Sequence, residues 1–274
     1  MRNVAEYHRP RHIEEALALL ARTEIPTVPI GGGSQLIGSG RRDVQAVVDL
    51  RDLGLSYVRR EEDALRVGAT TPLQVLIDSP ESAQAWNGEL ARVSGLTAAR
   101  NLREQGTIAG TLVSAEGNNP VAALLLALGA SVTLQPGGRA IALDAFFARR
   151  ASLLTGSLMT EVAIPLPHPG ESAAFEKVSR TPADVPIVCA AVRARIEGGV
   201  VHDVRIALGG VAPTPIRGPR IERRVEGQSP DRISFELADE DIDPTSDFMG
   251  SAAYRREMAA VLIRRAVTRL FQAA

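Results

Sequence analysis

One stretch of the sequence, residues 107–130, joins a turn of small residues to an unbroken apolar run. It reads TIAGTLVSAEGNNPVAALLLALGA. Val121 to Leu128 carry no polar side chain, so this segment predicts a buried helix. Ala109 and Gly110 precede it, and residues this small allow a large, flat or phosphorylated ligand to lie against the backbone. We therefore expect a fold that buries one helix completely and presents a turn of small residues to a ligand.

A second turn of small residues, Ile30-Gly31-Gly32-Gly33-Ser34-Gln35, follows a predicted strand at 27–30. Its backbone N–H groups can cradle phosphates, and two such turns suggest one extended ligand held at two places. The spacing imitates a Rossmann fingerprint, but Leu36 stands where that fingerprint has its third glycine. The dozen residues after Gly33 are also too few for a crossover helix. Taken alone, this stretch is explained equally well as a glycine-rich surface loop.

Composition limits the class of protein. The formal net charge of -1 removes the usual electrostatic case for nucleic-acid binding. The single cysteine, Cys189, excludes a disulfide framework and an iron–sulfur cluster held by this chain alone. Pro10 separates His8 from His12, which argues against a helical metal pair, and we expect no metal site. With no apolar segment of signal-peptide type at the N-terminus and no run long enough to span a bilayer, we expect a cytoplasmic protein.

Hydrophobic spacing predicts a mixed α+β chain. Ile13, Ala16, Leu17 and Leu20 follow the spacing of an amphipathic helix. Further helices are predicted at 80–85, at 87–99 and from Asp144, and strands at 27–30, 46–50, 57–60, 64–68, 131–135 and 160–164. The cluster of prolines at 165–169, followed by Gly170, marks the best domain boundary.

Beyond the proline cluster the pattern changes. A strand is predicted at 175–179, and strands at 187–196 and 200–208 flank Gly198-Gly199, a strong hairpin signal. The last segment is helical, with one apolar face formed by Ala259, Leu262, Ile263, Ala266 and Leu270. This part of the chain therefore predicts an antiparallel sheet covered by helices.

Single polar residues give weak functional signals. Asn119 and its neighbours Ser114 and Asn118 are typical of caps and turns. Taken alone, Lys177 within a strand is interpreted as a solvent-facing lysine, and Cys189 within an apolar strand as a core residue rather than a nucleophile. No Ser-His-Asp order or carboxylate pair stands out in the sequence.

Several stretches, taken together and in this order, resemble one family. They read YHRPRHIEEALALL, IGGGSQLIG, VVDLRDL, LRVGATTPLQVL, NLREQGTIAGTLVSAEGNNPVAALLLALGA, EVAIPLP, FEKVSRTPADVPIVCAAV and RIALGGVAPTPIR. They resemble the flavin-binding medium subunit of molybdenum hydroxylases, the group of carbon monoxide dehydrogenase and xanthine dehydrogenase. The resemblance implies a vanillyl-alcohol-oxidase-type (PCMH-type) FAD-binding domain over 1–168, with α+β subdomains of about 1–54 and 55–168. A smaller domain of antiparallel sheet and helices would cover 171–274.

The resemblance implies FAD as the cofactor, lying between the subdomains. Gly32 to Ser34 would lie closest to the pyrophosphate, and Thr107 to Thr111 would meet the ribityl chain and flavin. Lys177 falls where the family has a lysine near the flavin, and Leu153 or Leu154 falls near the segment over the ring. The complete set of predicted cofactor-binding residues is Ile30, Gly31, Gly32, Gly33, Ser34, Gln35, Leu36, Thr107, Ala109, Gly110, Thr111, Asn119, Leu154 and Lys177.

The same resemblance implies an oxidoreductase subunit that works within a heterotrimer. Its partners would be a molybdopterin-binding large subunit and a small subunit with [2Fe–2S] clusters. Electrons would pass from a cluster through FAD to an acceptor such as NAD or a quinone. The flavin would do the redox chemistry, and the protein would position and tune it.

Several positions depart from the family pattern, among them Glu104, where Arg103-Glu104 replaces a family R-N. Where the family usually writes T-I-G-G-N, this chain has Ala109 for the first glycine and Thr111 for the asparagine. Pro120 stands where the family usually carries an aspartate. These departures define an alternative function, a flavin-free or weakly flavin-binding structural subunit of the same kind of complex.

Overall fold

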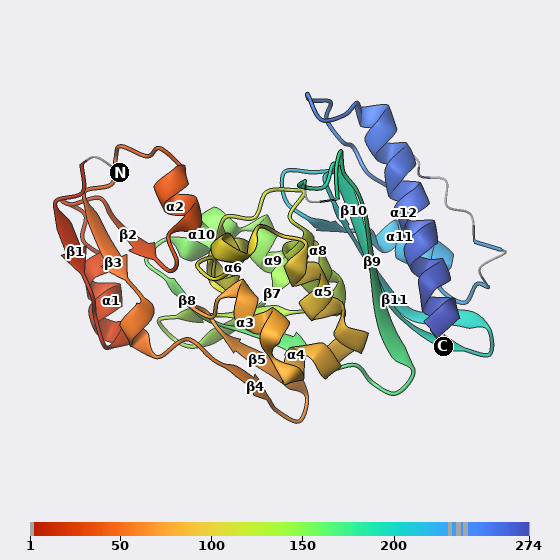
Figure 1. The fold of residues 1–274 in the computed structure, drawn as a ribbon, viewed down its shortest axis with the longest axis horizontal. Helices are drawn as coiled ribbons and strands as arrows, with labels where there is room; N and C mark the ends of the chain where they lie inside the picture. The colour runs from red at the N-terminus through yellow and green to blue at the C-terminus, as the bar shows by residue number, and fades with distance from the viewer. Residues whose placement is uncertain (1–2, 183, 230–231, 234–236, 238–240, 274) are drawn as a thin grey trace. The chain divides into compact units, whose positions relative to one another are not determined.

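The computed structural model describes residues 3–182, 184–229, 232–233, 237 and 241–273. Internal contacts divide the chain into two compact units, each built from separate segments (Figure 1). Unit 1 comprises Met1–Leu76, Ala99–Ser114 and Ser131–Ile164, and unit 2 comprises Ile77–Ala98, Ala115–Ala130 and Pro165–Ala274. The chain thus crosses between the units several times before it reaches the proline cluster.

Unit 1 contains a parallel sheet of three strands in the order β1-β3-β2. Its strands are β1 (Glu6–His8), β2 (Thr27–Ile30) and β3 (Ala46–Asp49). The predicted helix at 13–20 is confirmed as α1 (Ile13–Leu20), which packs the buried side chain of Ala16 with Val48 and Leu50. The strands predicted at 27–30 and 46–50 are confirmed as well, although β3 ends at Asp49.

The second sheet of unit 1 has five strands in the order β4-β5-β8-β6-β7. These are β4 (Val58–Arg60), β5 (Ala64–Gly68), β6 (Ser131–Gln135), β7 (Arg139–Ala142) and β8 (Leu158–Pro165). The antiparallel pairing of β4 with β5 confirms the strand pair predicted at 57–60 and 64–68. The accompanying helices are α2 (Ser34–Gly38), η1 (Arg51–Leu53), α3 (Leu73–Asp78), α6 (Arg100–Arg103), α7 (Ile108–Val113), α9 (Leu143–Ala148) and α10 (Arg150–Leu154).

Unit 2 is built on an antiparallel sheet in the order β12-β11-β10-β9. Its strands are β9 (Glu171–Val178), β10 (Val188–Glu197), β11 (Val200–Gly209) and β12 (Ile216–Arg217). The predicted hairpin is confirmed, since Gly198 and Gly199 turn with positive φ between β10 and β11. Side chains of α12 (Ala252–Ala273) share a core with β10 and with α11 (Pro219–Val225), which confirms a sheet covered by helices.

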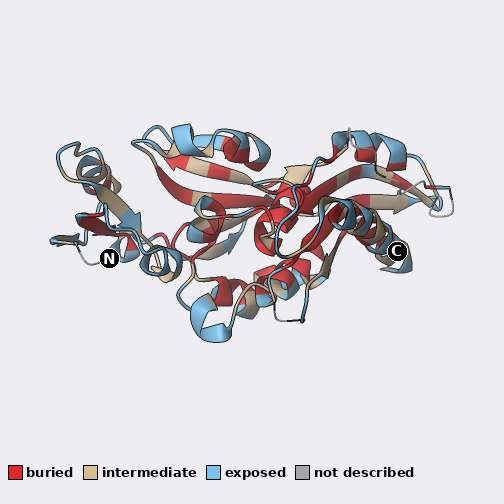
Figure 2. Cartoon of the chain, turned by 90° about the horizontal axis from the view of Figure 1, so that it is seen from above, coloured by how far each residue is buried: buried red, intermediate tan, exposed pale blue. Residues whose placement is uncertain are grey.

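The apolar run of 107–130 forms the buried helix that the sequence predicts. All nine residues of α8 (Pro120–Leu128) are buried (Figure 2). The side chain of Asn119 caps this helix by accepting a hydrogen bond of 2.9 Å from the Ala122 N–H, and Pro120 takes the first helical position, where no N–H is needed. The helix packs on β10 and β11, and Figure 1 shows it on the face of the sheet opposite α12. Within the described residues, no helix combines the length and the hydropathy that a bilayer crossing requires.

The segment from α4 (Pro80–Gln84) to α5 (Glu89–Gly95) differs from its prediction. The helix predicted over 87–99 begins later, because the intervening η2 (Ala85–Gly88) places Trp86, Asn87 and Gly88 at positive φ. It also ends earlier, at Gly95. This kink brings Glu89 to the start of α5, where its carboxylate is buried.

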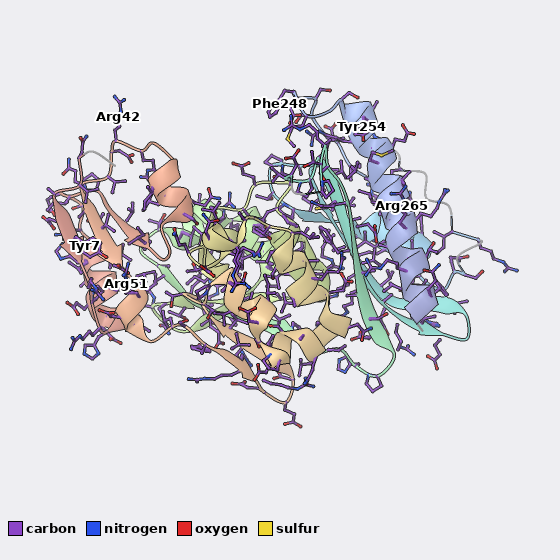
Figure 3. The ribbon with its side chains drawn as sticks, in the orientation of Figure 1. Tyr7, Arg42, Arg51, Phe248, Tyr254 and Arg265 are labelled. Carbon is purple, nitrogen blue, oxygen red and sulfur yellow. The ribbon has the colours of Figure 1, made fainter. Side chains whose placement is uncertain are left out.

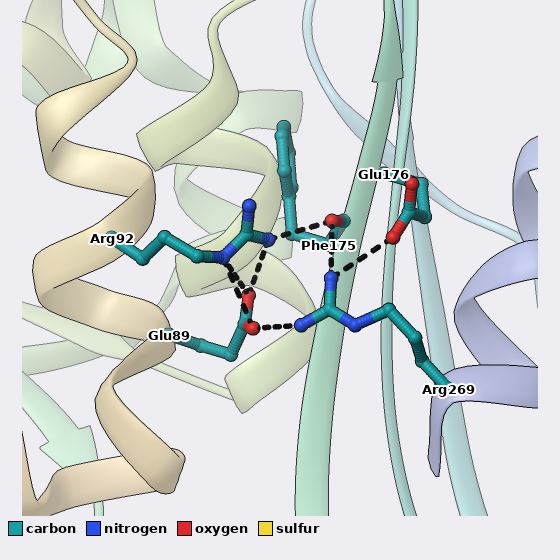
Figure 4. A network of polar contacts seen from close by, with 5 residues as sticks. All are labelled: Glu89, Arg92, Phe175, Glu176 and Arg269. Carbon is teal, nitrogen blue, oxygen red and sulfur yellow. Dashed lines mark hydrogen bonds and ion pairs between the residues drawn. The ribbon is translucent and has the colours of Figure 1, made fainter. Parts of the chain in front are cut away.

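A network of charged groups centred on Glu89 connects three elements of unit 2 (Figure 4). Arg92 of α5 pairs with the Glu89 carboxylate at 2.7 Å, and Arg269 of α12 pairs with it from the other side. Arg269 also pairs with Glu176 of β9 at 2.9 Å, and both arginines donate to the Phe175 carbonyl. The network joins α12 to β9 and α5, and loss of either arginine would leave the buried carboxylate with less compensation for its charge.

Candidate functional site

A cavity of about 670 Å³ lies within unit 1. Five of the predicted cofactor-binding residues line it, namely Gly31, Thr107, Ala109, Gly110 and Leu154. The resemblance leaves either Leu153 or Leu154 as the residue near the segment over the flavin ring. Of these two, Leu154 lines the cavity. The volume falls in the range of small-molecule and cofactor sites.

The start of α7 supplies small side chains to this cavity. Its N-cap is Thr107, whose hydroxyl accepts the Gly110 N–H at 3.1 Å. The N–H of Ile108 donates to the Thr71 carbonyl and that of Ala109 to the Ala69 carbonyl. Because these donors are engaged within the chain, this turn offers a ligand close approach rather than a set of free N–H groups.

The glycine turn after β2 packs against the segment that leads into α7. A Cβ atom on Gly31 would lie 2.9 Å from the Thr107 hydroxyl oxygen. A Cβ on Gly32 would lie 1.4 Å from the Gln105 carbonyl oxygen, so no other residue fits there without displacing the backbone. Segments about 75 residues apart in the sequence therefore meet at one wall of the cavity.

The same turn carries consecutive backbone donors. Gly33 has a φ of +76° and begins α2, and Ile37 donates to its carbonyl. Among the described residues, the N–H groups of Gly32, Gly33 and Ser34 donate to no group of the chain. Successive unpaired N–H groups of this kind form an anion-binding nest.

The remaining predicted residues of unit 1 lie next to these two turns. Ile30 ends β2, whereas Gln35 and Leu36 belong to α2. Thr111 is buried within α7, and its hydroxyl donates to the Thr107 carbonyl at 2.9 Å. This hydroxyl therefore stabilises the first turn of the helix.

Asn119 and Lys177 belong to unit 2. The side-chain oxygen of Asn119 is engaged as the cap of α8. The Lys177 ammonium donates to the carbonyls of Pro182 and Asp184 at 2.8 and 3.0 Å. Partial burial lowers the pKa of this lysine. The carbonyls of Pro182 and Asp184 thus hold the Lys177 ammonium group against the backbone.

Sequence reasoning did not single out several other residues of the cavity wall. They include Thr70, just after β5, and the segment 155–159, which runs from the end of α10 into β8. The stretch LRVGATTPLQVL, which contains Thr70, contributes to the family resemblance, but no local pattern distinguishes this threonine. The described residues that line the cavity include no Asp, Glu, His, Cys or Lys. The wall is therefore suited to binding, and it offers no side chain that exchanges a proton near neutral pH.

Cys189 lies in the core of unit 2, as the sequence predicts. Its side chain is fully buried, and burial raises the pKa of the thiol from 9.0 to about 12. A thiol with this pKa holds no appreciable thiolate at neutral pH and is a poor nucleophile.

Because the Cys189 thiol is buried, we expect the free energy of unfolding to fall at alkaline pH. Because the folded-state pKa lies above the unfolded value, the neutral thiol stabilises the fold fully below about pH 9, and the contribution is lost as pH rises toward 12. Between pH 8 and pH 10 the free energy of unfolding should fall by about 1 kcal/mol more than in Cys189→Ala. Urea unfolding at both pH values measures this difference. Equal losses in the two proteins would contradict the prediction.

Comparison with known proteins gives two family matches. Residues 2–167 match the model described as FAD binding domain in molybdopterin dehydrogenase. Residues 173–270 match the model described as CO dehydrogenase flavoprotein C-terminal domain.

Individual relatives match along almost their whole length. The carbon monoxide dehydrogenase medium chain of Afipia carboxidovorans is 33% identical over an alignment of 276 positions. The alignment covers 96% of this chain and 96% of the relative. The glyceraldehyde dehydrogenase medium chain of Sulfolobus acidocaldarius is 28% identical and covers 95% of this chain and 96% of its own. A crystal structure of Cu,Mo-CO dehydrogenase in a cyanide-inactivated form contains a chain with a TM-score of 0.89 and 32% identity, with 99% of each chain covered.

Proposed function

Because this chain belongs to the family that carries the FAD binding domain of molybdopterin dehydrogenases, we propose that it transfers electrons through FAD within a molybdenum hydroxylase complex. The predicted family and fold class are confirmed: a PCMH-type FAD-binding domain is followed by a CO dehydrogenase flavoprotein C-terminal domain. The cofactor of this family is FAD. We also propose the domain boundaries 1–168 and 171–274, with subdomains of about 1–54 and 55–168, which the matched ranges 2–167 and 173–270 support.

The observation that carries the proposal is the cavity of unit 1, where the two turns of small residues meet. In our proposal the free N–H groups of Gly32, Gly33 and Ser34 hold the pyrophosphate, which an anion-binding nest favours. The small side chains of Ala109 and Gly110 let the ribityl chain and flavin approach the backbone. Leu154 supplies apolar wall, and Thr107 keeps the turn in shape by capping α7. Thr111, Asn119 and Lys177 remain proposed contacts through the family resemblance.

When bound, FAD supplies one- and two-electron redox chemistry. The chain itself binds and orients the cofactor and shields it from water. Cys189 is the only cysteine and is buried, so [2Fe–2S] clusters must be held by another subunit. We propose a cytoplasmic heterotrimer with that small subunit and a molybdopterin-binding large subunit. The electron acceptor would be NAD or a quinone.

In this proposal the substrate that the complex oxidises is bound on another subunit. One relative is the medium chain of a carbon monoxide dehydrogenase and another that of a glyceraldehyde dehydrogenase. Chains of one family thus serve different substrates, which supports a substrate site on the large subunit.

A flavin-free structural subunit is the second candidate function. Ala109, Thr111 and Pro120 favour it. Ala109 adds a methyl group where the family has glycine, which narrows the approach to the backbone. Thr111 and Pro120 lack the polar groups of the asparagine and aspartate that they replace. Pro120 is buried at the first position of α8, and its side chain has no hydrogen-bonding group.

The absorption spectrum of the purified chain tests the proposed function. We expect flavin bands near about 370 and about 450 nm that survive desalting, and release of FAD on denaturation. The flavin-free alternative predicts a colourless chain that takes up no FAD when it is added. That result would overturn the electron-transfer proposal.

A further inference from the structure

Thr70 lines the cavity of unit 1 and carries a hydroxyl group that has no hydrogen-bond partner. The residue follows β5 and is only 8% exposed. Its N–H donates to the Leu55 carbonyl at 3.0 Å, so its backbone position is fixed. Its hydroxyl oxygen is buried and has no hydrogen-bond partner, although the residue lines the cavity.

An unpaired buried hydroxyl is unfavourable, so its presence calls for a partner outside the chain. The other buried hydroxyls without a partner in the described chain, those of Ser82 and Ser94, lie in unit 2 and do not line this cavity. Thr70 also adjoins the turn that we assign to the flavin, because the Ala69 carbonyl accepts the Ala109 N–H at 3.2 Å.

We propose that the Thr70 hydroxyl hydrogen-bonds a polar atom in the ribityl–flavin part of bound FAD. This inference rests on the proposed function. A hydroxyl can donate to the ring nitrogens, ring carbonyls and ribityl oxygens, and it can accept from the ring N–H or a ribityl hydroxyl. Thr70 is thus a cofactor-binding residue in this proposal, and it supplies a polar contact on a cavity wall that it shares with Ala109.

The test measures FAD affinity and the stability of the flavin-free chain together. Thr70→Val removes the hydroxyl and keeps the shape, whereas Thr70→Ser keeps the hydroxyl. The matched control is Thr160→Val: Thr160 is buried in the same unit, its hydroxyl donates to the Thr133 carbonyl at 3.4 Å, and it does not line the cavity. Dissociation constants come from titrating FAD into the flavin-free chain and following the flavin fluorescence.

We expect Thr70→Val to bind FAD about five- to tenfold more weakly, and Thr70→Ser and Thr160→Val to stay within about twofold of the parent chain. The melting temperature of flavin-free Thr70→Val should equal or exceed that of the parent, because an unpaired buried hydroxyl is removed, while Thr160→Val should melt lower. Equal FAD affinity of Thr70→Val and the parent would overturn the inference and assign the hydroxyl to water. Failure of the parent chain itself to bind FAD would instead refute the proposed function.

Discussion

Replacement of Ala109 by Phe is expected to give a folded chain without bound flavin. Ala109 lies in the first turn of α7 and lines the cavity of unit 1. A phenyl ring there occupies space that the proposed site assigns to the ribityl–flavin part of FAD. We expect FAD to bind at least about a hundredfold more weakly, since overlap with a ligand is not relieved by a small shift. FAD titration of the purified variant measures the loss.

The folded state of Ala109→Phe should survive, because the position is helical and the residue lines a cavity that can take a larger side chain. Its helix propensity changes by less than about 1 kcal/mol. Ala148→Phe is the control, since Ala148 is exposed on α9 in the same unit and does not line the cavity. It should bind FAD like the parent chain. If Ala109→Phe retains FAD, the flavin lies elsewhere and the assignment of 107–111 is wrong.

Replacement of Arg255 by Met is expected to destabilise unit 2 by about 3 kcal/mol. The Arg255 side chain is 6% exposed, and its guanidinium donates to the carbonyls of Ile187 and Gly210 at 2.9 and 2.7 Å. Methionine fills similar space but donates no hydrogen bond, so two buried carbonyls lose their donor. The pair with Asp247, at 2.6 Å, adds less because that carboxylate is 46% exposed. The melting temperature should fall by roughly 6–12 °C.

Arg265→Met controls for the loss of a positive charge from α12. Arg265 is exposed on the same helix and projects from it in Figure 3. Its replacement should change the free energy of unfolding by less than about 0.5 kcal/mol. If both variants melt at the same temperature, the guanidinium of Arg255 does not hold the 187 and 210 segments together.

Local patterns in the sequence were sufficient to predict many elements of the fold. The apolar run of α8 and the hairpin around Gly198-Gly199 were predicted correctly, because a continuous apolar segment and a two-glycine turn each specify one local structure. The helix predicted over 87–99 was too long. Its start was displaced by the positive φ angles at 86–88, which do not alter hydrophobic spacing.

Only part of the candidate site could be predicted from the sequence. Its two turns were identified by their small residues, but the sequence does not show that Gly32 packs on Gln105 or that Thr70 lines the same cavity. Nor does it show that carbonyls of the 179–187 loop hold Lys177.

The sequence by itself determined the family, the mixed α+β class and the turns that form the proposed cofactor site. Their signals lie in residue types and spacings within single segments. The tertiary structure alone decided which segments share a wall, which N–H groups stay free at Gly32 to Ser34, and that the Thr70 hydroxyl is left without a partner. Those properties depend on contacts between segments tens of residues apart, and the spacing within one segment carries no information about them.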